Sequence, residues 1–174
     1  MKNRRKRGAT TIEMTLVGIP IIFIMISVFE ISRGMWMYHT AAHAVRKGVR
    51  FATVHGLNCV LNPPGVNNNC TVTANDIAAA IKFAGVGLDP ATTTVTFTSL
   101  NGSFSCPLNG SDTGVNCAGV WPPAGAGASK QGSALRVFVR VPFNSALAMF
   151  WPGSRPMSFA RTNLNADSSD VVQF

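Results

Sequence analysis

One apolar stretch decides the fold of this chain: residues 12–31, which read IEMTLVGIPIIFIMISVFEI. Glu13 and Glu30 stand near its two ends, and no charged residue lies between them. As an α-helix these residues would be about 30 Å long, which matches the hydrocarbon core of a bilayer. The stretch therefore predicts a membrane anchor that crosses the bilayer once.

The anchor is expected to remain in the protein and not to be removed as a secretory signal peptide. The apolar core of a signal peptide is shorter, and a cleavage site of small residues follows it closely. The first Ala-x-Ala of this chain is Ala42-His43-Ala44, far downstream of residue 31. The anchor is therefore predicted to be part of the folded protein.

A single long helix is predicted over residues 9–55. Residues 35–54 contain no proline, and apolar residues recur there at spacings of three and four, as they do on one face of a helix. The helix would therefore continue beyond the anchor and project well out of the lipid.

Residues 56–174 are predicted to form a small α+β domain, because Gly, Pro, Asn, Ser and Thr become frequent from residue 56 on. The pair Asn75-Asp76 is expected to cap a helix at residues 77–84, and residues 101–132 are expected to form a long loop. Four segments show strand patterns: residues 70–73, 92–100, 133–143 and 157–164. The expected architecture is one short helix on a three- or four-stranded, mainly antiparallel sheet, behind the long N-terminal helix.

Four cysteines fall in two local pairs, Cys59 with Cys70 and Cys106 with Cys117. Their even number, their loop-rich surroundings and the retained anchor indicate disulfides formed in an oxidising compartment. Four cysteines can pair in three ways. We expect the pairing of sequence neighbours, Cys59 with Cys70 and Cys106 with Cys117. A zinc site is disfavoured, because zinc motifs bring cysteines within a few residues of each other and no CxxC occurs here.

The charge of the chain argues against a nucleic-acid partner, although the net charge is +8. Five of the 15 Lys and Arg residues precede residue 8, and four more occur by residue 50. From residue 55 on, six basic residues stand against five acidic ones. A nucleic-acid binder carries its basic face on the folded domain, so the basic residues are assigned to membrane topology. The basic block at residues 2–7 and the predicted disulfides indicate that the N-terminus lies in the cytoplasm and residues 56–174 lie outside.

No catalytic, cofactor-binding or metal-binding set is expected, and no small-molecule substrate. All three histidines, His39, His43 and His55, lie in or beside the long helix, and no glutamate follows Glu30. His39 and His43 stand one helical turn apart, a spacing that can hold a metal. No carboxylate or cysteine accompanies them nearby, so a metal site is disfavoured.

The order of the N-terminal features resembles the type IV pilin-like class, and more specifically the TadE-like proteins, which are minor pilins (pseudopilins) of the tight-adherence (Tad/Flp) pilus. A basic leader at residues 1–8 ends in Gly8, Ala9 follows, and Glu13 stands five positions past that glycine. After these come a mid-span proline, a Glu-x-x-Arg motif and an Ala/Arg/Gly-rich helix, which appear here as Pro20, Glu30 to Arg33, and residues 44–52. The resemblance covers residues 4–53, under a third of the chain.

The resemblance implies that a prepilin peptidase cuts between Gly8 and Ala9 and that Glu13 serves subunit assembly. It implies as partners other pilins and pseudopilins, the pilus assembly platform, the prepilin peptidase and inner-membrane lipid. Simpler interpretations stay open at this point. Glu13 could favour the N-terminal end of a helix dipole, Pro20 could only kink the helix, and Glu30 with Arg33 could be an ordinary surface ion pair.

The expected function is that of a structural component, a processed minor pilin in the biogenesis of an adhesive Tad/Flp pilus. The expected location is the bacterial inner membrane, with a single pass, or a surface pilus into which the protein is incorporated. The alternative is an uncleaved, membrane-anchored periplasmic protein that binds a ligand or an envelope partner. Cleavage after Gly8 distinguishes the two.

Overall fold

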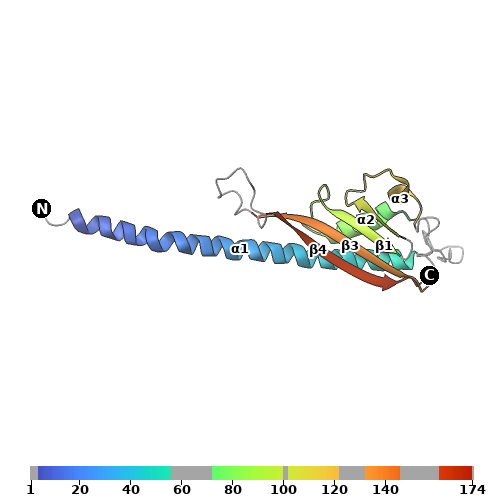
Figure 1. Ribbon diagram of the computed structural model, residues 1–174, viewed down its shortest axis with the longest axis horizontal. Coiled ribbons are helices and arrows are strands. Elements are labelled where there is room, and N and C mark those ends of the chain that lie inside the picture. The colour runs from blue at the N-terminus through green and yellow to red at the C-terminus, as the bar shows by residue number, and fades with distance from the viewer. Residues whose placement is uncertain (1–3, 56–71, 100–101, 122–131, 146–160, 174) are drawn as a thin grey trace.

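A computed structural model describes residues 4–55, 72–99, 102–121, 132–145 and 161–173. Figure 1 shows a long helix that begins alone at the N-terminus and ends packed against a sheet and the shorter helix α2 (Ala74–Ala84). In chain order the elements are α1 (Arg4–Val54), α2 (Ala74–Ala84), β1 (Thr94–Ser99), β2 (Gly102–Pro107), α3 (Val115–Ala118), β3 (Ala134–Asn144) and β4 (Arg161–Val171). We call the part formed by α2, α3, the four strands and the C-terminal half of α1 the head.

The predicted long helix is confirmed, and α1 contains 51 residues, or about 76 Å of helix. It begins at Arg4, ahead of the expected residue 9, so residues 4–7 of the basic leader are helical too. Its two halves differ in their surroundings. From residue 10 to residue 29 almost every side chain is exposed, whereas from residue 41 one face is buried in the head. That buried face consists of small and β-branched residues: Ala41, Ala44, Val45, Val49 and Ala52.

The helix expected at residues 77–84 exists, but it begins earlier and has a different cap. Thr73 is the N-cap, and its side chain accepts a hydrogen bond from the backbone N–H of Asp76, 3.1 Å away. The Asp76 carboxylate in turn accepts from the Thr73 backbone N–H at 2.7 Å. This capping box satisfies backbone donors at both positions, and the expected Asn75-Asp76 cap is therefore wrong by two residues.

The sheet is four-stranded and fully antiparallel, in the order β2-β1-β3-β4. The α+β architecture is therefore confirmed, and the strands expected at residues 92–100 and 133–143 correspond to β1 and β3.

Three predicted segments differ from the structure. The expected long loop contains β2 and α3. The closing strand begins at Arg161 and runs to Val171, well past the expected end at residue 164, and residues 157–160 lie outside the described part. The strand expected at residues 70–73 is not seen in its described half. Val72 belongs to no strand, and Thr73, besides capping α2, makes only an isolated bridge with Val120.

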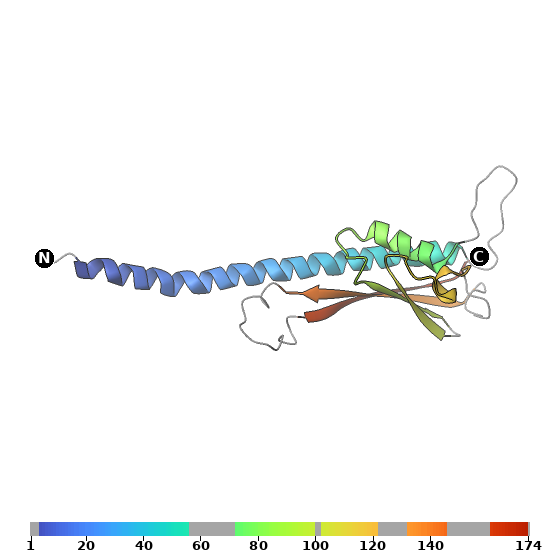
Figure 2. The ribbon, with the colours of Figure 1, turned by 90° about the horizontal axis from the view of Figure 1, so that it is seen from above.

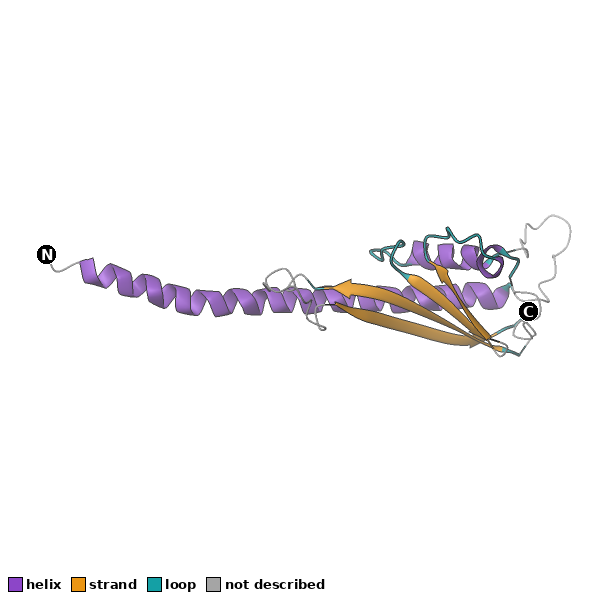
Figure 3. Ribbon diagram, turned by 45° about the horizontal axis from the view of Figure 1, so that its top comes forward, coloured by secondary structure: helices purple, strands orange, loops and turns teal. Residues whose placement is uncertain are grey.

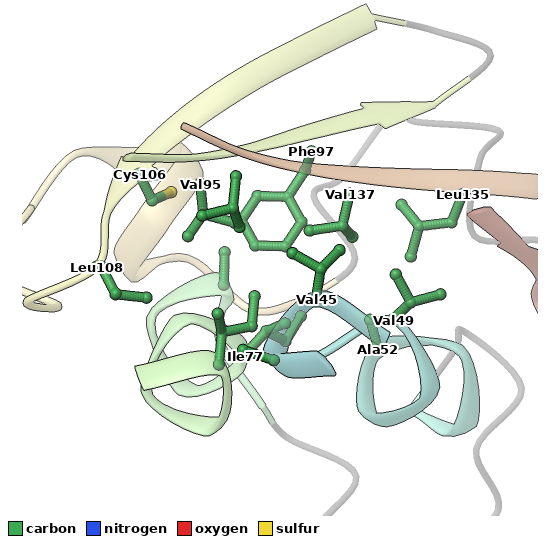
Figure 4. Close-up of a cluster of buried hydrophobic side chains, with 14 of the residues drawn as sticks. Val45, Val49, Ala52, Ile77, Val95, Phe97, Cys106, Leu108, Leu135 and Val137 are labelled. Carbon is green, nitrogen blue, oxygen red and sulfur yellow. The ribbon is translucent and has the colours of Figure 1, made fainter. Parts of the chain in front are cut away.

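The core of the head lies between the sheet and the two longer helices. Figures 2 and 3 show α1 and α2 on the same side of the sheet. In Figure 4, Phe97 and Val137 of the sheet point toward Val45 of α1, with Ile77 of α2 beside them. All four side chains are at most 1% exposed. The opposite face of the sheet is polar. It carries a salt bridge between Arg136 and Asp167 at 2.7 Å and a hydrogen bond between the Thr96 and Ser105 hydroxyls at 2.7 Å.

The disulfide predicted between Cys106 and Cys117 is confirmed. It joins β2 to α3, and both cysteines are almost fully buried. The other predicted disulfide, Cys59–Cys70, lies outside the described residues. Within the head, the confirmed bond holds the irregular segment after β2 against the sheet.

Replacing both Cys106 and Cys117 with serine is expected to lower the free energy of unfolding of the head by about 3 kcal/mol, because the unfolded chain regains the freedom that the short loop removes. The measurement is urea unfolding of the full chain in detergent, followed by near-UV circular dichroism. A Cys59→Ser/Cys70→Ser variant measured alongside reports on the other pair separately. An unchanged urea midpoint in the Cys106/Cys117 variant would show that this bond does not stabilise the head.

Candidate functional site

The N-terminal half of α1 exposes a continuous apolar surface. Twelve large apolar side chains between residues 12 and 29 are each at least 50% exposed: Ile12, Met14, Leu16, Val17, Ile19, Ile21, Ile22, Phe23, Ile24, Met25, Val28 and Phe29. A surface of this size needs lipid or protein to cover it. In the part of the chain that the structure describes, one helix is long and apolar enough to cross a membrane, and it is α1.

Thr15 and Ser27, two hydroxyl side chains in this half of α1, donate hydrogen bonds within the helix. Thr15 Oγ1 donates to the carbonyl oxygen of Ile12 at 2.9 Å, and Ser27 Oγ donates to that of Phe23 at 2.8 Å. Such i−3 and i−4 bonds give both hydroxyls a partner within the helix. Thr15 and Ser27 can therefore enter a hydrocarbon phase without losing a hydrogen bond.

The residues of the proposed processing and assembly site follow one another along α1. Gly8 and Ala9 lie in the helical backbone, and Glu13 is exposed on the helix surface. No acidic residue falls in the first turn of α1, so Glu13 does not interact with the start of this helix. Pro20 lies inside α1 and has no N–H to donate to the carbonyl of the preceding turn.

Glu30 and Arg33 form the pair that their spacing predicts, and they also join α1 to the sheet. The guanidinium of Arg33 lies 3.4 Å from Glu30 Oε1 and donates a second bond to the backbone oxygen of Asn144 at 3.3 Å. It also stacks over the ring of Phe143, with 5.1 Å between Arg33 Cζ and the ring centroid. Glu30 is only 8% exposed. The pair therefore marks the point where the membrane-proximal end of β3 meets the helix.

The two histidines considered as metal ligands, His39 and His43, are exposed on α1. Among the described residues, no three His, Cys, Asp or Glu side chains come together in a group that could hold a metal ion.

Sequence reasoning missed two features of this region. The contacts of Arg33 with Phe143 and Asn144 join residues about 110 positions apart, and no local pattern signals them. At Gly48 the sequence alone indicates only the low helix propensity of glycine. In the structure a Cβ atom at position 48 would lie 2.3 Å from Ile81 Cγ1, so the glycine allows α1 and α2 to approach closely. The small residues around it, Ala41, Ala44 and Ala52, are the signal that could have indicated a close helix contact.

A lone apolar helix that ends in an α+β head is the layout of a protein anchored in a membrane by a single pass. Residues 8–50 of this chain match the family model of TadE-like proteins. The matched range begins at Gly8 and contains Glu13, Pro20, Glu30 and Arg33, so the resemblance seen in the sequence is confirmed over the N-terminal helix. The N-terminal helix of this chain is therefore similar to that of TadE-like proteins. No curated protein and no solved structure matches the chain.

Proposed function

We propose that the protein is a minor pilin (pseudopilin) that acts as a structural component in the assembly of an adhesive Tad/Flp pilus, and that it catalyses no reaction. One observation carries the proposal: the TadE-like match begins at Gly8, covers the exposed apolar half of α1 and ends at residue 50, where α1 is packed into the head. Both the proposed cleavage site after Gly8 and the segment that would be packed in a fibre therefore belong to the matched region.

Removal of the leader at residues 1–8 is the first step of the proposed function. The leader carries five of the 15 basic residues, so cleavage leaves ten basic against seven acidic residues and lowers the net charge from +8 to +3. Before cleavage the five charges hold the N-terminus in the cytoplasm. Afterwards their absence lets the apolar end of α1 pack against other subunits, because unpaired charges are costly in an apolar surrounding.

The proposed location of the head is the periplasm, with the anchor at residues 12–31 in the inner membrane. The Cys106–Cys117 bond supports this side of the membrane, since disulfides persist in oxidising compartments. The proposed partners are the prepilin peptidase, the assembly platform and other pilins. The size of the head favours a subunit that is present in few copies. A globular domain on every helix would crowd a fibre whose main subunits are short pilins.

Gly8→Leu is expected to abolish processing in the native host. Gly8 lies within α1, so a peptidase has to open the helix there, and glycine lowers the cost of doing so by about 1 kcal/mol relative to a good helix former. Intact mass measurement of the membrane-extracted protein should show a wild-type chain that begins at Ala9 and a variant that keeps residues 1–8.

Gly18→Leu is the matched control for this experiment, because no atom lies within 4 Å of a Cβ built at position 18. It is expected to be processed like the wild type. A wild-type chain that retains residues 1–8 would overturn the proposal in favour of an uncleaved, anchored binding protein.

A further inference from the structure

A groove lies where the head meets the membrane-proximal part of α1. Its volume is about 620 Å³, and one wall comes from α1 while the other comes from the ends of β3 and β4. Its lining includes the apolar side chains of Ile31, Met35, Phe143 and Leu164, together with Glu30. Of these, Leu164 also packs against the edge of the core of the head.

The position of the groove along the membrane normal indicates which part of the bilayer it faces. Ser27 and Ile31 line one end, and both fall within the anchor at residues 12–31. Tyr38 lines the other end, about 16 Å further along α1. The groove therefore opens at one end into hydrocarbon and reaches past the membrane surface at the other. Its apolar wall is continuous with the exposed lipid-facing surface of α1.

A positive charge stands beside this groove. The side chain of Arg33 is 43% exposed, and its contacts with Glu30, Asn144 and Phe143 hold it in place. A guanidinium has five N–H donors, more than these contacts use, and its planar geometry suits phosphate oxygens. The groove thus combines an apolar channel with a fixed cation at the level expected for lipid headgroups.

We propose that this groove binds one acyl chain of a membrane phospholipid and that the lipid phosphate lies beside Arg33. The proposal rests on the membrane anchor alone and not on cleavage or pilus assembly. The bound chain would fill the space between α1 and the ends of β3 and β4, and so fix the head against the bilayer. Two other occupants are conceivable on chemical grounds: this chain's own residues 146–160, which connect Ser145 to Arg161, and the apolar helix of a second copy.

The test uses the full chain in nanodiscs of phosphatidylethanolamine and phosphatidylglycerol with a trace of phospholipid that carries a photoreactive acyl chain. After irradiation, peptide mass spectrometry compares labelling of residues 162–164 with that of residues 169–172. Both segments belong to the end regions of β4, and the second lies about 23 Å further from the groove along the strand. A lipid in the groove should label the first segment and leave the second unlabelled.

Gly34→Phe should reduce labelling of residues 162–164 by about tenfold, the change that corresponds to about 1.4 kcal/mol of lost binding. Gly34 lines the groove, and a Cβ there has only Phe143 nearby at 3.7 Å, so an aromatic ring would occupy the channel. Leu164→Asp should have the same effect by placing a charge in it. Near-UV circular dichroism confirms that each variant keeps its fold.

Gly18→Phe is the matched control, because it adds the same side chain to the anchor outside the groove, and it should leave β4 labelling unchanged. Three results would overturn the proposal. The first is equal labelling of the two ends of β4, and the second is labelling of residues 162–164 that persists in both groove variants. The third comes from a variant with a photoreactive residue at position 35. Crosslinking of that residue to a second copy or to residues 146–160, and not to lipid, would show that one of these fills the groove.

Discussion

Gly48→Val is expected to lower the free energy of unfolding of the head by about 3 kcal/mol, because the added methyl groups overpack a buried helix contact. Gly48 is buried, and Ile81 opposite it is fully buried. A Cβ at position 48 would lie 2.3 Å from Ile81 Cγ1 and 2.6 Å from Ile81 Cδ1. Neither helix can take up the extra volume without moving away from the other. Since a small domain has a total stability of about 5–15 kcal/mol, the loss is large.

The smaller substitution, Gly48→Ala, is the sharper test, because here the direction of the change in the free energy of unfolding distinguishes the two outcomes. Replacing a mid-helix glycine with alanine normally stabilises a helix by about 1 kcal/mol. Gly48→Ala is expected to do the opposite, because the clash with Ile81 outweighs the gain in propensity. At Gly34 the nearest atom to a built Cβ is Phe143 Cζ at 3.7 Å, an ordinary contact. Gly34→Ala is therefore the matched control and should be neutral or stabilising.

Urea unfolding of the full chain in detergent measures the stability of both variants, with near-UV circular dichroism, to which Trp121 contributes, as the probe. Trp121 reports on the correct interface, because its indole N–H donates to the backbone oxygen of Ala52 in α1 at 3.2 Å and its ring packs against Phe97. A Gly48→Ala variant as stable as Gly34→Ala would mean that α1 and α2 do not pack as closely as described.

Glu13→Ser is expected to insert into the membrane and to be cleaved normally, and yet to abolish co-purification with other pilins and piliation. After the proposed cleavage the chain would begin with the α-amine of Ala9, four residues before Glu13. In a stack of helices, the amine of a neighbour could lie against this carboxylate. The dielectric constant there is low, so the pairing energy is larger than at a water-exposed surface, and an unpaired carboxylate is costly.

The competing interpretation is that Glu13 only stabilises the start of the helix, an effect of about 0.3–1 kcal/mol. Before cleavage this cannot apply, since α1 begins at Arg4 and Glu13 lies beyond its first turn. After cleavage the helix starts near Ala9 and Glu13 comes close to the new end. Serine can still cap a helix terminus but cannot form an ion pair, so Glu13→Ser separates the two roles.

Adherence and piliation assays in the native host, together with intact mass of the processed chain, give the readout. Glu13→Asp keeps the charge, and Met14→Ala is a neutral control at the neighbouring exposed position. Normal adherence by the Glu13→Ser variant would refute the pairing role and leave helix stabilisation as the explanation.

The elements that sequence alone identifies are those whose pattern is set by their own residues. In α1 the unbroken apolar stretch and the spacing of three and four are both local. In β3 the buried residues Leu135, Val137, Val139 and Val141 alternate with exposed arginines. The Glu30–Arg33 pair was likewise predictable, because its two residues are one turn apart.

The elements that sequence reasoning missed owe their structure to neighbours. The residues of β2 are GSFSCP, a composition typical of a loop. The segment is a strand because it pairs with β1 along its whole length, from the pair of Ser99 in β1 with Gly102 in β2 onward. The dipeptide Asn101-Gly102 was an available turn signal, and Gly102 has a φ of +141°. In β4 the buried Ala166 and the half-buried Ser168 are small, so apolar alternation is absent, and pairing with β3 along 11 residues supplies the strand.

The continuity of α1 also has a mechanical consequence. No hinge or linker separates the anchored half of this helix from the half that contributes Ala44, Val45 and Val49 to the core. A pull on the N-terminal end, such as extraction of the helix from the bilayer, is therefore transmitted as axial tension directly into the head. There it acts as shear along the contacts of α1 with β3 and β4, so many side chains share the load at once and no single strand is peeled away.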